Sequence, residues 1–86
     1  MYSYQAERDK LFTEEGQRLF LAVRDDVNKK LDIAGAVMVQ KVNPHMGYDG
    51  WTFLACFDRL VELGEITPVN SNKVAGQHQI FRKTEY

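Results

Sequence analysis

The sequence predicts a mainly helical α+β fold, with three helices followed by a two-stranded β-hairpin. Its 86 residues form one domain. Two domains would each have roughly 40 residues, and a core of that size is rarely stable without disulfides, metals or oligomerisation. Two stretches place apolar residues at helical spacing, and the second of them ends at a glycine before two short stretches of strand character. We divide the chain into an N-terminal arm or helix extension, residues 1–12, and a folded domain, residues 13–86.

The first helix is expected to begin after Thr13. A threonine followed by two acids, Glu14 and Glu15, is typical of an N-cap with negative charge in the first helical turn. Apolar residues then recur every fourth position to about residue 31, which predicts an amphipathic helix; they are Leu19, Val23, Val27 and Leu31. Residues 1–12 are polar with scattered aromatics, and they fit either a helical arm or a frayed terminus.

The segment Ile33 to Val42 is ambiguous between helix and strand. Its β-branched residues favour a strand, whereas Ala34, Ala36 and Met38 favour a short helix. We predict a helix, because a lone strand would need a partner that only the C-terminal hairpin could supply. Asn43-Pro44 ends this helix, since the residue before a proline is disfavoured in the α region, and residues 43–50 form a loop.

A third helix is expected from Asp49, its cap, to Gly64, which can take the left-handed conformation at a helix C-terminus. Its core-facing residues are Phe53, Phe57 and Leu60, with Cys56 beside them as a small buried residue. Glu65 to Asn70 then forms a strand that Pro68 marks as an edge strand. A loop over Ser71 to Gln77 leads to the return strand, His78 to Thr84, with Ile80 or Phe81 facing the core.

The stretch from Phe57 to Ile66, with its apolar pair before Gly64, resembles the exit of the recognition helix in winged-helix proteins. Gly76 to Arg82 is likewise similar to the returning strand of the wing, so the resemblance covers about residues 13–84. It implies that the third helix enters the major groove of DNA and that the wing contacts the backbone or minor groove. The loop of residues 43–50 is longer than the tight turn usual in this family.

On this resemblance, the chain is a small DNA-binding protein and transcriptional regulator. The outward face of the third helix is expected to carry Thr52, Ala55 and Arg59 as base or phosphate contacts. The wing offers five further candidates, Lys73, Gln77, His78, Arg82 and Lys83. Asp49, Asp58, Glu62 and Glu65 against Arg59 give residues 49–66 a charge of −3. Lys73, Arg82 and Lys83 against Glu85 give residues 67–86 a charge of +2, so the wing suits phosphate better than the helix does.

The alternative is a winged-helix module that binds a protein partner and not DNA. The acidic third helix would then form the surface, with Trp51 as its anchor and Tyr48 beside it. Tyr4 and Phe12 are the remaining partner candidates. They either pack against a second copy of the chain, making a homodimer, or cover the chain's own core.

Several other classes of protein are excluded by what the sequence lacks. A single cysteine excludes an internal disulfide and fits a reducing compartment, the cytoplasm. Cys56, His45 and His78 fall in no paired metal-ligand spacing, so we expect no metal and no cofactor. No nucleophile or acid–base constellation can be named, so we expect no enzyme. The longest apolar run, Ile33 to Val39, is far short of the ~20 residues that span a bilayer.

Overall fold

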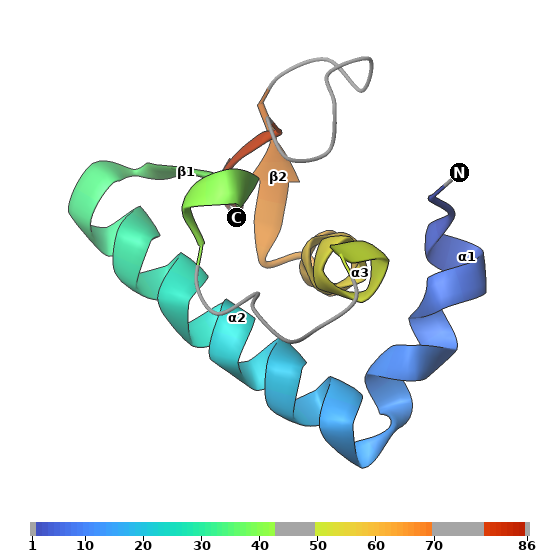
Figure 1. Ribbon diagram of the computed structural model, residues 1–86. Helices are drawn as coiled ribbons and strands as arrows, with labels where there is room; N and C mark the ends of the chain where they lie inside the picture. Colours follow the sequence, from blue (N-terminus) through green and yellow to red (C-terminus); the bar gives the residue numbers. More distant parts are fainter. Residues whose placement is uncertain (1, 43–49, 70–78, 86) are drawn as a thin grey trace.

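The computed structural model describes residues 2–42, 50–69 and 79–85 (Figure 1). Its elements follow in the order α1 (Tyr4–Glu7), the 3-10 helix η1 (Arg8–Phe12), α2 (Glu14–Ala34), β1 (Ala36–Met38), the 3-10 helix η2 (Val39–Lys41), α3 (Gly50–Glu62), β2 (Ile66–Pro68) and β3 (Ile80–Lys83). The prediction of a mainly helical α+β fold is confirmed. The small antiparallel sheet has three strands, however, where two were expected.

Helix α2 begins as the sequence predicts. The Thr13 hydroxyl oxygen accepts a hydrogen bond from the Gly16 backbone N–H at 3.0 Å, which satisfies a donor that the helix itself leaves unpaired. The apolar stripe from Leu19 to Leu31 is buried. The helix continues three residues beyond the expected end, to Ala34. It stops where Gly35 adopts a φ of 77° and donates its N–H to the Leu31 carbonyl at 2.8 Å.

The prediction of a helix over residues 33–42 is wrong. The first two residues of this segment end α2, and strand β1 then pairs antiparallel with β3, with Val37 opposite Phe81, before η2 follows. Both of these side chains are buried. The hairpin did supply the partner that a strand here requires, so burial of Val37 against β3 outweighed the helical preference of the neighbouring alanines.

Gly64 ends α3 and turns the chain into the sheet. Its φ is 76°. The Glu65 N–H donates to the Leu60 carbonyl and the Gly64 N–H to the Val61 carbonyl, each at 2.9 Å, which is the Schellman pattern of a helix end. Strand β2 then lies at one edge of the sheet, whose order is β1-β3-β2, so the edge position predicted from Pro68 is confirmed. The predicted cap Asp49 lies outside the described residues.

Helix α3 lies in the middle of the molecule. In Figure 1 it is seen end-on, with the N-terminal arm on one side and β2 on the other, and it also contacts α2. Its buried residues include Phe53, Phe57, Leu60 and Cys56, as predicted. The Phe57 ring stacks on Phe81 of β3 with 5.7 Å between centroids. The helix is thus enclosed by three parts of the chain.

The N-terminal arm, residues 2–12, is helical from Tyr4 onward and packs against the chain's own core. Leu11 is only 1% exposed. At the junction with α2, a Cβ atom added to Gly16 would lie 1.9 Å from the Lys10 carbonyl oxygen and 2.8 Å from the Leu11 Cα atom. Glycine is therefore required at position 16 so that the arm can lie this close to α2.

Candidate functional site

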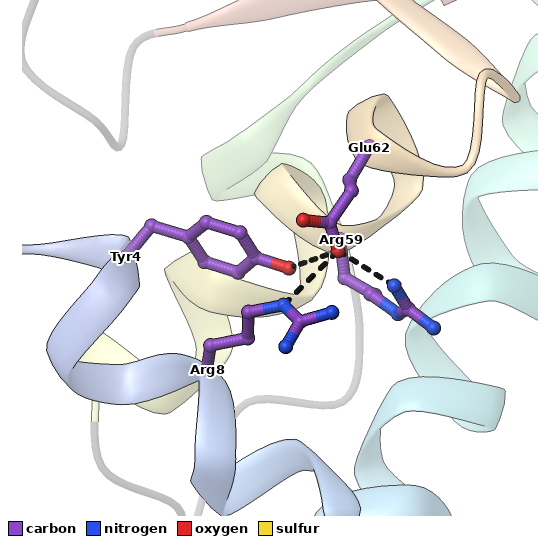
Figure 2. A network of polar contacts seen from close by, with 4 residues as sticks. All are labelled: Tyr4, Arg8, Arg59 and Glu62. Carbon is purple, nitrogen blue, oxygen red and sulfur yellow. Dashed lines mark hydrogen bonds and ion pairs between the residues drawn. The ribbon is translucent and has the colours of Figure 1, made fainter.

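Five side chains gather where the arm crosses the C-terminal half of α3. We call them the arm–helix cluster: Tyr4, Arg8 and Phe12 from the arm, and Arg59 and Glu62 from α3. Figure 2 shows the polar members, with Tyr4 and Arg8 approaching the helix from the arm. The cluster lies at the surface, in contrast to most of α3.

One carboxylate oxygen organises the cluster. Glu62 Oε1 accepts hydrogen bonds from the Tyr4 hydroxyl at 2.9 Å, from Arg8 Nε at 3.2 Å and from Arg59 Nη1 at 2.6 Å. Two of these bonds are also ion pairs. Glu62 therefore ties the arm to α3 through both a hydroxyl and a guanidinium group.

Phe12 lies against both arginines. Its ring centroid is 5.0 Å from Arg8 Cζ and 5.3 Å from Arg59 Cζ, within the range of a cation–π interaction. The Phe12 side chain is nevertheless 49% exposed. The aromatic ring thus orients two guanidinium groups and still offers apolar surface to solvent.

The electrostatics of the cluster follow from these contacts. Hydrogen bonds from Arg59, Tyr4 and Arg8 hold the pKa of Glu62 below its ordinary value. Partial burial, and then the bond to Glu62, raises the pKa of the Tyr4 hydroxyl. The same carboxylate raises the pKa of Arg8. At neutral pH the cluster therefore holds two guanidinium cations, one carboxylate and a protonated tyrosine.

A second tyrosine bond lies beside the cluster. The Tyr2 hydroxyl donates to Asp58 Oδ2 at 2.5 Å. Burial raises the pKa of both groups, and the bond from Tyr2 partly offsets the rise at Asp58. Two consecutive turns of α3 are thus held by tyrosines of the arm.

The structure brings together three residues that the sequence assigned to different functions. Tyr4 and Phe12 were partner candidates and Arg59 was a DNA candidate, and all three meet in the arm–helix cluster. Arg8 was not assigned to any site, and Glu62 was named only as one of the acids of the third helix. Tyr4, Arg8 and Phe12 recur every fourth residue, and Glu62 follows Arg59 by three, spacings that place side chains on one face of a helix. This periodicity is a signal that could have grouped the arm residues on one face and the α3 residues on another, but it does not show that the two faces meet.

The expectation that Thr52 and Ala55 lie on an outward face of α3 is wrong. Thr52 is 9% exposed and Ala55 is fully buried. The reason is that the arm, α2 and β2 all pack on this helix, so little of its circumference is left for solvent. Neither side chain is accessible to DNA in this arrangement.

Trp51 lies at the start of α3 and is 44% exposed. It precedes Asp58 by seven residues and Glu62 by eleven, which places all three along one stripe of the helix. The rise of a helix separates Trp51 from Asp58 by about 10 Å along the axis. The exposed Trp51 therefore lies on the same side of α3 as Asp58 and Glu62, but nearer the N-terminus of the helix than the part that the arm covers.

The basic candidates on the hairpin are only partly described. Arg82 and Lys83 are exposed on β3, and they are not members of the arm–helix cluster. Lys73, Gln77 and His78, together with the partner candidate Tyr48, lie outside the described residues.

Comparisons with models of known protein families, with curated proteins and with solved structures find no match for this chain. Within the part of the chain that the structure describes, no helix has the length and apolar character needed to cross a membrane. The same residues bring together no group of histidine, cysteine and acidic side chains that could hold a metal ion.

Proposed function

We propose that this chain is a winged-helix protein-interaction module that binds a protein partner through the arm–helix cluster, with Trp51 at the end of the same surface. The observation that carries this proposal is the packing of the arm on α3. A helix that reads DNA must present an open face to the major groove. Here the arm occupies that side, through the bonds from Tyr2 to Asp58 and from Tyr4 to Glu62.

The composition of the exposed surface also favours a protein partner. Tyrosine, tryptophan and arginine are the residues most enriched among energetic hot spots of protein interfaces. The cluster contains a tyrosine and two arginines on an exposed phenylalanine, and Trp51 lies on the same side of α3. Because the side chains are already fixed by mutual contacts, binding would cost little additional side-chain ordering.

The winged-helix assignment rests on the junction between α3 and the hairpin. The Gly64 helix end and the β2–β3 pair follow α3 in the order that the resemblance implies. The third strand, β1, adds to this arrangement and does not interrupt it.

The experiment is site-specific photo-crosslinking in cells. A photoreactive amino acid at Phe12 is expected to capture a discrete partner, whereas the same residue at Leu21 is not. Leu21 is a matched control, since it is 55% exposed on α2 and belongs to no part of the cluster. Equal capture at both positions, or capture at neither, would contradict the proposal.

DNA binding through the hairpin is the second candidate function. It is favoured by Arg82 and Lys83, which are exposed on β3, within the C-terminal region of charge +2. If it is correct, replacing both residues with glutamine weakens binding to a random duplex and flattens the dependence of affinity on salt. Replacing Arg59 with glutamine leaves that binding unchanged. Absence of duplex binding by the unaltered chain at low salt would exclude this candidate.

A homodimer formed through Tyr4 and Phe12 remains a prediction. Tyr4 packs on the core of its own chain, so Phe12 is the member of this pair with more surface to offer a second copy. Sedimentation of the chain and of a Phe12→Ala variant would test it, because a dimer that uses this ring would dissociate in the variant.

A further inference from the structure

The arm–helix cluster has the arrangement of a carboxylate-binding site that the chain fills with a carboxylate of its own. Three donors from three residues converge on Glu62 Oε1. Charge-assisted bonds of this kind are the stronger class of hydrogen bond. We propose, building on the interaction function above, that an acidic side chain of the protein partner binds here in place of Glu62.

Glu62 does not use the full capacity of the two arginines. Each guanidinium group has five N–H donors and binds a carboxylate best through two parallel bonds. Arg8 donates to Glu62 through Nε alone and Arg59 through one terminal nitrogen alone. In Figure 2 the remaining nitrogens of Arg59 lie on the side away from Glu62. A carboxylate from outside can therefore meet a guanidinium edge that the internal one does not reach.

Glu62 can also leave the site. Its side chain is 40% exposed, on the surface of α3. Exposed ion pairs of this type contribute little net stability, because water and salt screen them. A rotation of the Glu62 side chain toward solvent would open the position of Oε1, while Phe12 continues to hold both guanidinium groups.

The charges select an acidic partner. Within the cluster two guanidinium groups face one carboxylate, so the cluster itself carries one excess positive charge on an otherwise acidic helix, and Asp58 beside it is bonded to the Tyr2 hydroxyl. A single carboxylate beside an apolar side chain fits this charge and the exposed Phe12 ring. A nucleic acid backbone fits less well, since its row of phosphates would extend beyond the two guanidinium groups and meet the carboxylate of Asp58 beside the cluster.

The test is a binding titration with a short labelled peptide in which glutamates alternate with leucines. Replacing Arg8 or Arg59 with glutamine should weaken binding about tenfold, since each removes a charge-assisted bond. Glu62→Gln should have the opposite effect and tighten binding about two- to fivefold, because it removes the charge of the internal competitor at the cost of two surface ion pairs. Arg24→Gln is the matched control and should change nothing. Arg24 makes a similar pair with Glu65, at 2.8 Å, but lies outside the cluster.

Three further ligands test whether the site prefers a carboxylate. A peptide with glutamine in place of glutamate should not bind. A random DNA duplex and inorganic phosphate should bind more weakly than the acidic peptide and should not distinguish Glu62→Gln from the unaltered chain. Equal or tighter binding of the duplex or phosphate with the same dependence on Arg8 would overturn the preference for a carboxylate. Circular dichroism of each variant checks that its fold is retained.

Failure of this inference can be told apart from failure of the proposed function. If crosslinking at Phe12 captures a partner but Glu62→Gln does not strengthen capture and the acidic peptide does not bind, the partner uses the surface without a carboxylate in the cluster. If Phe12 and Leu21 capture alike, the interaction surface itself is wrong.

Discussion

Replacing Gly16 with alanine sets two physical effects against each other. Alanine is the better helix former, by about 1 kcal/mol in a helix interior, so propensity alone predicts a more stable chain. The packing predicts the reverse, because the new Cβ atom would lie 1.9 Å from the Lys10 carbonyl oxygen and 2.8 Å from the Leu11 Cα atom. Both neighbours are backbone atoms, so a side-chain rotation cannot relieve the contact.

Overpacking of this kind costs about 1–3 kcal/mol, and two backbone contacts under 3.0 Å place Gly16→Ala at the upper end. After the gain in propensity we expect a net loss of about 2 kcal/mol in the free energy of unfolding. For a domain of this size that lowers Tm by roughly 8–16 °C. Urea unfolding and thermal melts followed by circular dichroism measure both quantities.

Two other glycines provide matched controls. A Cβ atom at Gly50 meets nothing within 4 Å, so Gly50→Ala should be neutral or slightly stabilising. Gly35 also has open space, but its φ of 77° disfavours any residue with a side chain, so Gly35→Ala should cost about 1–2 kcal/mol. If Gly16→Ala proves neutral or stabilising while Gly35→Ala destabilises, the close approach of the arm to α2 is wrong.

Two further predictions concern titration. The lowered pKa of Glu62 means that its network stabilises the fold above the ordinary glutamate pKa, about 4.3, and that this contribution is lost as pH falls through the lowered value. In urea titrations, Glu62→Gln should therefore be less stable than the unaltered chain at pH 7, and the gap should close in stronger acid; a gap that widens would contradict this. The raised pKa of Asp58 has the opposite effect on stability, favouring the fold as pH falls. It does so equally in the Glu62→Gln variant and in the unaltered chain, so it cancels in the difference between their stabilities. Burial raises the pKa of the Cys56 thiol to about 12, so a thiol reagent at neutral pH should modify it only as the chain unfolds. Rapid labelling of the native protein would show that Cys56 is accessible.

The sequence predicted the elements whose signals are local. The cap at Thr13, the stripe of α2, the apolar face of α3 and the turn at Gly64 each depend on residues within one or two helical turns, and each is confirmed. Strand β1 was missed because its stability comes from a partner more than forty residues away in the chain. Local propensity in Ile33 to Val42 is nearly balanced, so the distant contact decides the structure.

The candidate site was predictable only in part, for the same reason. Tyr4, Phe12 and Arg59 were named from their residue types. Their convergence depends on how the arm folds back onto α3, and no short-range pattern specifies that. The misplacement of Thr52 and Ala55 has this cause as well, because a helical wheel shows which residues share a face but not which segment of the chain covers it. The spacing of Tyr4, Arg8 and Phe12 is visible in the sequence, but the sequence does not show that these side chains pack against α3.

The two ends of the arm are held by different interactions, and this bears on how a partner could act. The η1 end is anchored in the core by Leu11, by the close approach at Gly16 and by the bond from Gln17 Nε2 to the Leu11 carbonyl at 2.8 Å. The α1 end is held by two half-buried tyrosines and their bonds to Asp58 and Glu62. A ligand that takes the place of Glu62 would transfer the bond from Tyr4 away from α3 to the partner and leave the anchor at Leu11 intact. Partner binding would therefore loosen α1 without unfolding the domain, since the interactions that it replaces are not those that hold the core together.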